Sequence, residues 1–193
     1  ISDIDESIKK IKKVEPDVIF QASYLEDITQ FVKKYKEYNI VPKAVVNYCG
    51  GFQDPQFVEN LGHDGNYFSG SSASLPSVSV NNEIANEIND IYKKKTGEDI
   101  DGPALEEFAS AMIIADSINT AGDIDGNKIM EVLKTKTFDT PYFTSNQIKF
   151  DESGQNLNTI SFIVQIQDGK YEAVWPLNIQ NKKPQIISQK WGL

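Results

Sequence analysis

Arginine is missing from this sequence, because all 19 basic residues among its 193 are lysines. A ligand carboxylate or phosphate would therefore have to be held by backbone amides, hydroxyl groups or lysine. The 28 acidic residues give a formal net charge of −9, and both signs are mixed along the chain. Since nucleic acids and anionic membranes attract concentrated positive charge, neither is expected as a partner.

Cysteine, histidine and long apolar runs are also scarce. Cys49 is the only cysteine, which excludes an internal disulfide and a thiolate zinc cluster. No stretch approaches the roughly 18 to 20 apolar residues of a membrane-spanning helix. The first residues, ISDIDESIKKIKK, lack the apolar centre of a signal peptide, although an upstream signal or anchor could have been removed.

The first part of the chain alternates between helix and strand patterns. Isoleucines at helical spacing over residues 4–11 precede a short apolar run at 17–20, which predicts a helix that leads into a buried strand. Ser23 and Glu26 form a capping-box pattern, and the residues after them predict an amphipathic helix over about 25–38.

The alternation continues to about residue 70. A second strand is predicted over 43–47, and Asp54-Pro55 then begins a helix that Gly62 ends, before a strand-like stretch at 66–68. Such alternation is typical of a parallel sheet covered on both faces, where ligands bind beyond the carboxyl ends of the strands. The positions where strands end are therefore the candidate binding positions.

The pattern changes at SGSSASLPS, residues 69–77, which is small and polar and predicts a linker or hinge. Helices are then expected in succession: one ends near Gly97, one runs over 103–122, and one is capped by Asp125. Their apolar faces require a sheet or partner that the preceding residues do not supply. We therefore expect the chain to be incomplete at its N-terminus.

The last part of the chain is β-rich from Gln147 onward. The segments SFIVQIQ and YEAVWPL alternate in the manner of strands, and Asp168-Gly169 between them predicts a hairpin.

The order of these segments resembles the branched-chain-amino-acid-type substrate-binding proteins of ABC transporters, which are type I periplasmic-binding-protein-like solute receptors. The likeness runs from about Val14 to Trp175 and rests on EPDVIF, ASYLEDITQFVKKYKEYNI, GPALEEFASAMIIADSINTAG, KIMEVLKTKTFDTPYFTSNQIKFDESGQN and FIVQIQDGKY in this order. The resemblance implies an α/β fold of two lobes with parallel sheets flanked by helices, without its N-terminal portion. Residues 1–75 would be the main part of the second lobe, 76–160 the helical end of the first lobe, and 161–193 the return strands and tail.

The resemblance also implies a function. Such a protein lies outside the cytoplasm, in the periplasm or lipid-anchored at the cell surface. It captures a small polar ligand, such as an amino acid, between its lobes and delivers it to ABC transporter membrane subunits, with no cofactor, metal or catalysis. A ligand-sensing receptor domain of a signalling protein is an alternative, because it uses the same closing cleft.

The resemblance places ligand-binding residues at strand exits. Tyr24 stands where relatives place an aromatic residue facing the cleft, and Phe108 matches an aromatic position on the long first-lobe helix. The next exit carries Asn47, Tyr48, Cys49 and Gly50.

One departure from the family concerns the ligand's charge. Relatives that bind α-amino acids carry an acidic residue near the glycine pair, which pairs with the ligand ammonium. Cys49 or Gly50 stands there in this chain. The departure favours an uncharged or differently charged ligand, unless Glu26, Asp27 or Asp54 substitutes.

Two other patterns in the sequence suggest different functions. Cys49 and His63 suggest a thiol hydrolase, but no group is identified that would orient the histidine. The run Asp123–Asn127 resembles a calcium loop, yet Lys128 and Lys134 stand where that loop requires glycine and glutamate. A turn followed by a helix cap is the expectation for the latter run.

Overall fold

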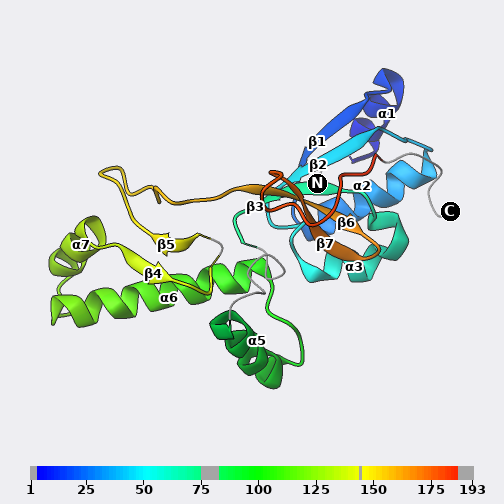
Figure 1. The fold of residues 1–193 in the computed structure, drawn as a ribbon. Coiled ribbons are helices and arrows are strands. Elements are labelled where there is room, and N and C mark those ends of the chain that lie inside the picture. Colours follow the sequence, from blue (N-terminus) through cyan, green and yellow to red (C-terminus); the bar gives the residue numbers. More distant parts are fainter. Residues whose placement is uncertain (1–3, 75–82, 144, 187–193) are drawn as a thin grey trace. The chain divides into compact units, whose positions relative to one another are not determined.

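The computed structural model describes residues 4–74, 83–143 and 145–186. The chain forms two compact units: unit 1 comprises Ile1–Ser72 and Phe162–Leu193, and unit 2 comprises Ala73–Ser161 (Figure 1). The assignment of these units to the two lobes stays a prediction.

Unit 1 is built on a five-stranded sheet in the order β1-β2-β3-β6-β7. Strands β1, β2 and β3 run parallel, whereas β6 and β7 are antiparallel to their neighbours. The expected parallel sheet is thus a mixed one, because the chain re-enters it through β6, which runs antiparallel to β3, and then turns at the predicted Asp168-Gly169 hairpin. The strands are β1 (Val18–Ala22), β2 (Ala44–Tyr48), β3 (Ser69–Ser72), β6 (Phe162–Gln167) and β7 (Lys170–Trp175).

Three helices accompany this sheet: α1 (Ile4–Val14), α2 (Leu25–Glu37) and α3 (Pro55–Leu61). Their boundaries lie close to the predicted ones because local signals set them. Asp54 caps α3 by accepting a hydrogen bond from the Gln56 amide. The core gathers side chains of helices and strands, including Ile8, Ile28, Val32, Val45 and Phe57.

A polar pair is buried between α2 and β1. The Tyr35 hydroxyl donates to Gln21 Oε1 at 3.0 Å, and both residues are buried. Burial raises the pKa of the Tyr35 hydroxyl above its usual range, because the charged phenolate would lose its hydration. Tyr35 therefore acts as a neutral donor.

Two local expectations for unit 1 are wrong. Ser23 does not cap α2, because the helix begins one residue later than the capping box requires and Tyr24 occupies the N-cap position. The Ser23 hydroxyl instead accepts a hydrogen bond from Gln21 Nε2.

The predicted linker begins with a strand. Residues 69–72 form β3, whose small residues suit the tight packing, since a Cβ on Gly70 would lie 2.4 Å from the Phe52 ring. Residues 75–77 of the predicted linker lie outside the described part of the chain.

Unit 2 contains the three predicted helices, α5 (Glu83–Thr96), α6 (Gly102–Ala121) and α7 (Gly126–Thr135). Its described strands, β4 (Phe138–Thr140) and β5 (Asn146–Ile148), form an antiparallel pair. The described residues of unit 2 thus lack the parallel sheet expected of a lobe. The predicted cap at Asp125 is confirmed, because its side chain accepts from the amides of Asn127 and Lys128.

Helix α6 is apolar on more than one side. Leu105, Ala109 and Ile113 are buried at four-residue spacing, whereas the apolar Met112 and Ile114 are about half exposed. A helix that is hydrophobic all round is typical of one covered on several sides. The described part of unit 2 covers one of these sides.

We expect Tyr35→Phe to destabilise unit 1 by about 1–3 kcal/mol, because Gln21 Oε1 would be buried without its donor. Urea unfolding of the 193-residue chain measures this change. Tyr38→Phe, at the half-buried C-cap position of the same helix, is the control. Equal unfolding midpoints for the two variants would contradict the expectation.

Three carboxylates in unit 2 make the chain sensitive to acid. The pKa values of Asp99, Asp123 and Asp151 are lowered, chiefly by hydrogen bonds from Asn89, Lys128 and Ser153 respectively.

Groups with a lowered folded-state pKa contribute stability above their unfolded value, and this contribution is lost as pH falls through the folded value. The unfolding temperature should therefore fall below about pH 4. Asp151→Asn should flatten this dependence more than the control Glu152→Gln, and equal pH profiles for the two variants would contradict the assignment.

Candidate functional site

The candidate site lies where the parallel strands of unit 1 end. β1 and β2 pair in register from Val18 with Ala44 to Ala22 with Tyr48, so both strands finish at the same edge of the sheet. The Ser23 amide donates to the Tyr48 carbonyl at 3.3 Å just beyond this edge. The two exit loops therefore start side by side.

Gly51 joins the two loops by direct backbone contact. A Cβ at this position would lie 2.4 Å from the Tyr24 carbonyl carbon, 2.5 Å from the Leu25 nitrogen and 2.7 Å from the Ser23 oxygen. Only glycine fits such an approach without displacing one of the loops. At Gly50, by contrast, an added Cβ would meet nothing within 4 Å.

The loop after β2 is anchored on its far side as well. The amides of Gln53 and Asp54 donate to the Gly50 carbonyl, both at 3.1 Å. Gln53 Nε2 donates to the Ser71 carbonyl at 2.7 Å, and the Tyr171 hydroxyl donates to the Phe52 carbonyl at 2.6 Å. The loop is therefore fixed to both β3 and β7.

Three of the predicted site residues are exposed at this edge. Tyr24 is 74% and Tyr48 71% exposed, and Cys49 is exposed beside them with a positive φ of 81°. Gly50 continues the same exit loop. The fold therefore places these predicted site residues together at one edge of the sheet.

Asn47 and Phe108 differ from the others. Asn47 is buried and its amide donates to the Ser69 carbonyl at 3.1 Å, so it serves to hold β2 against β3. It shares a face with Val45, which is also buried. Phe108 belongs to unit 2, where its ring packs edge-on against Tyr142 at 5.2 Å between centroids.

Trp175 is a candidate that the sequence did not identify as part of this edge. In the sheet, Trp175 pairs with Ile163 of β6, and Ile163 pairs with Ser71 of β3. Ser71 lies one residue beyond Gly70, which pairs with Asn47 of β2. Trp175 is 56% exposed. Its place follows from two antiparallel registers, which no local sequence signal reveals.

The charges at the exits are acidic. Glu26 and Asp27 lie in the first turn of α2, and Asp54 is occupied in capping α3. No lysine occurs in residues 21–27 or 47–54. The exits therefore suit neutral or positively charged ligand groups better than anions.

A thiol hydrolase is not supported by the geometry. Cys49 follows the carboxyl end of β2, whereas His63 lies in the 3-10 turn η1 (Gly62–Gly65) that follows α3 on its way to the amino end of β3. The two residues therefore belong to opposite edges of the sheet. A base must lie within hydrogen-bond reach of its nucleophile.

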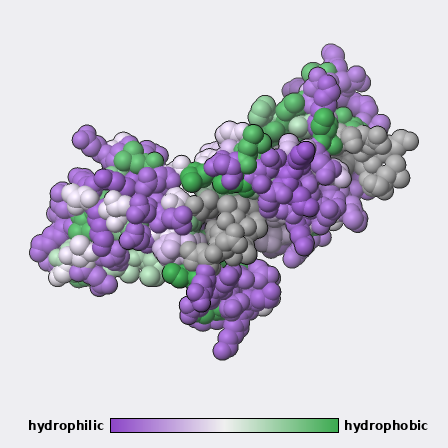
Figure 2. All heavy atoms as spheres, in the orientation of Figure 1, coloured by the Kyte–Doolittle hydropathy of each residue, from purple (hydrophilic) through white to green (hydrophobic). Residues whose placement is uncertain are grey.

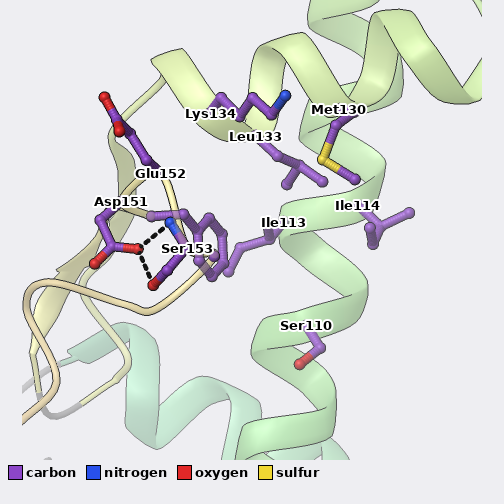
Figure 3. Close-up of a pocket in the computed structure, with 11 residues that line it drawn as sticks. Ser110, Ile113, Ile114, Met130, Leu133, Lys134, Asp151, Glu152 and Ser153 are labelled. Carbon is purple, nitrogen blue, oxygen red and sulfur yellow. Dashed lines mark hydrogen bonds between the residues drawn. The ribbon is translucent and has the colours of Figure 1, made fainter.

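Unit 2 contains a separate apolar pocket of about 500 Å³. Ile113 and Ile114 of α6 face Met130 and Leu133 of α7 across it (Figure 3). At its rim, Asp151 Oδ1 accepts hydrogen bonds from the amide and hydroxyl of Ser153. This carboxylate oxygen is occupied within its own turn, so the pocket offers mainly apolar contact.

The described residues contain no group of three or more His, Cys, Asp or Glu side chains placed to hold a metal ion. In the same part of the chain, the helices are too short or too polar to cross a membrane.

Gly51→Ala should force the two exit loops apart and destabilise the chain by about 1–3 kcal/mol, the usual cost of overpacking. Gly50→Ala is the matched control, with an expected change within about 0.5 kcal/mol. Chemical unfolding compares the two variants. Similar losses at both positions would mean that the Gly51 contact does not hold the loops together.

Comparison with known proteins agrees with this architecture. A family model described as periplasmic binding protein matches residues 2–170. A Leu/Ile/Val-binding protein homolog of Brucella suis is 26% identical over 179 residues, which cover 90% of this chain and 45% of that relative.

Solved structures share the fold. A leucine binding protein of Thermotoga maritima superimposes with a TM-score of 0.76 at 20% identity, covering 90% of this chain and 48% of that one. A branched-chain amino acid transporter substrate binding protein of Streptococcus pneumoniae, in complex with isoleucine, gives 0.74 at 21% identity, covering 91% and 49%. The chain spans about half the length of these relatives. It belongs to the periplasmic binding protein family and has the type I fold of that family.

Proposed function

We propose that this chain is part of an extracytoplasmic solute-binding protein of an ABC transporter, with the carboxyl edge of the unit 1 sheet as one wall of its binding site. The observation that carries the proposal is the pair of exposed tyrosines, Tyr24 and Tyr48, on two exit loops that Gly51 locks together. Exposed aromatic rings on a rigid backbone bind ligands at low entropic cost.

The ligand that suits this wall is a small polar molecule with an apolar or planar part. The rings of Tyr24 and Tyr48 offer stacking surfaces and hydroxyl groups, and Trp175 extends the aromatic surface along the same edge. Glu26 and Asp27 favour a ligand that is neutral or carries a positive group here. An amino acid fits if one of these carboxylates takes the place of the acidic residue that relatives carry near the glycine pair.

Capture would follow from a shift in population. A solute that contacts both lobes binds the closed state better than the open state, and closure then presents a composite surface to the transporter's membrane subunits. Phe108 of unit 2 stays a predicted ligand contact. Catalysis is not part of the proposal, because Cys49 and His63 lie at opposite edges of the sheet.

A thermal-shift titration of the protein as its gene encodes it tests the proposal. The panel should contain branched, polar and aromatic amino acids, amides, small organic acids, nucleosides and sugars. A solute receptor should be stabilised by about 2.7 kcal/mol at 100 times the Kd of its ligand.

Variants locate the binding site. Tyr24→Ala and Tyr48→Ala should each weaken binding by on the order of 10- to 100-fold, as expected for an aromatic anchor. Ile124→Ala, at a residue of unit 2 that is 84% exposed, is the control. No stabilisation by any compound would refute solute capture, whereas stabilisation that both tyrosine variants retain would place the ligand elsewhere.

A further inference from the structure

A network of buried amides lies on β6, outside the exit loops. Gln165 and Gln167 stand two positions apart on this strand, so their side chains lie on the same face of the sheet. Both residues are buried, at 3% and 5% exposure. Buried amides need hydrogen-bond partners, and the C-terminal tail, residues 181–186, provides several of them.

The two glutamine side chains bind the main chain of the tail. Gln165 Nε2 donates to the Gln185 carbonyl at 2.7 Å, and the Gln185 amide donates to Gln165 Oε1 at 2.8 Å. Gln167 Nε2 donates to the Lys183 carbonyl and to Gln165 Oε1, both at 2.8 Å. The side-chain amides thus bind the tail at every second residue, as the main chain of a neighbouring strand would.

The side chains of the tail contribute less to this contact than its main chain. Residues 181–186 are exposed, and Figure 2 shows hydrophilic surface where Figure 1 draws the tail in red. Gln185 Nε2 reaches Gln167 Oε1 only at 3.4 Å. A tail held by hydrogen bonds can leave the sheet at small cost, because water then hydrates the polar groups on both sides, whereas release of an apolar contact would expose hydrophobic area. The contact is therefore suited to reversible docking.

The same tail binds β7 beside Tyr171. The amides of Asn181 and Lys182 donate to the Ala173 carbonyl at 3.0 and 3.2 Å. Asn181 Nδ2 also donates to Glu172 Oε2 at 2.8 Å. Glu172 and Ala173 follow Tyr171 directly in the strand. The tail therefore restrains β7, which stands at one end of the sheet.

Tyr171 carries this restraint to the loop that follows β2. Its hydroxyl donates to the carbonyls of Phe52 and Asp54 at 2.6 and 3.3 Å. Its ring packs edge-on against Phe52, with 5.4 Å between the centroids. The exit loop 49–54 thus depends on the position of β7, and three consecutive residues of β7 link this loop to the tail.

We propose that the C-terminal tail is a reversible strap that orders the exit loop 49–54 through β7, so that release of the tail loosens the loop and lowers the affinity of the ligand site. The loosening follows from contacts within unit 1, whereas the effect on affinity rests on the proposed function. Because coupling between two sites is reciprocal, a bound solute should in turn hold the tail in place. Gln165, Gln167 and Tyr171 are positioning residues, which act on a ligand through the loop.

Two variants of the gene-encoded protein interrupt this series of contacts at different points. Gln185→Pro removes the amide that donates to Gln165 Oε1. Gln185→Ala is the matched control, because it keeps both main-chain groups that Gln165 binds. Tyr171→Phe removes the hydrogen bonds to the loop and keeps the contacts of the tail.

Two measurements follow the tail and the loop separately. Tryptic cleavage between Lys182 and Lys183 measures release of the tail. Hydrogen exchange of the loop amides that donate to the Gly50 carbonyl measures the order of the loop. Gln185→Pro should raise both rates by on the order of 10-fold over its control, because both then proceed through local opening. Tyr171→Phe should raise the exchange rate more than the cleavage rate.

Three outcomes would overturn the strap. Unchanged cleavage in Gln185→Pro means that the glutamines do not hold the tail. Faster cleavage without faster exchange means that the tail and the loop are independent. Exchange that rises equally in α2 means general destabilisation of unit 1.

The effect on affinity is measured with whichever solute stabilises the unsubstituted protein in the thermal-shift titration. Its Kd should rise by on the order of 5- to 10-fold in Gln185→Pro relative to Gln185→Ala. An unchanged Kd despite a loosened loop would overturn the link to the ligand site. If no solute binds, the proposed function fails, while cleavage and exchange still decide whether the tail orders the loop.

Discussion

The parallel, in-register pairing of β1 with β2 is the constraint on which the rest of unit 1 depends. Because both strands run in the same direction and finish together, the chain must leave them at one edge and return through α2 and α3. Two backbone turns then meet in a space that allows no side chain between them, and Gly51 provides this fit. The site is thus a consequence of the topology, and the exposed rings at its edge are carried by the strand ends themselves.

The residues that fix the geometry of the site differ from the residues that offer contacts to a ligand. Gly51, Asn47 and Phe52 are buried and hold the exit loops to each other, to β3 and to β7. Tyr24 and Tyr48 are exposed and can be changed with little effect on packing. This separation allows ligand specificity to vary while the loop geometry stays constant. Such behaviour is expected when one fold supports different functions through different site residues.

Local signals predict most of the helices. The features that the sequence does not reveal depend on contacts between residues that are distant in sequence. Asp54-Pro55, Gly62 and Asp125 act within one turn of their helices, so their effect could be read from neighbouring residues. The sequence predicts a linker at β3 because its small residues have little strand propensity, whereas the strand pairs through Gly70, against which Phe52 packs. The resemblance predicts Asn47 in the site, although two-residue alternation with the buried Val45 indicates its inward orientation. Trp175 reached the edge through two antiparallel registers that cannot be read from sequence.

Both units expose apolar side chains in the part of the chain that the structure describes. β1 has apolar residues on both faces and α6 has them on more than one side, as is typical of elements buried on several sides. Solutes with aromatic or branched apolar groups would meet Phe20 on the isolated chain as readily as Tyr24, since both rings are exposed. Such adsorption follows apolar area and lacks the orientation that fixed loops impose. A binding measurement on these 193 residues alone would therefore combine binding at the Tyr24 edge with adsorption to the face of β1 that carries Phe20. A loss of affinity in Tyr24 and Tyr48 variants of the gene-encoded protein distinguishes capture from adsorption.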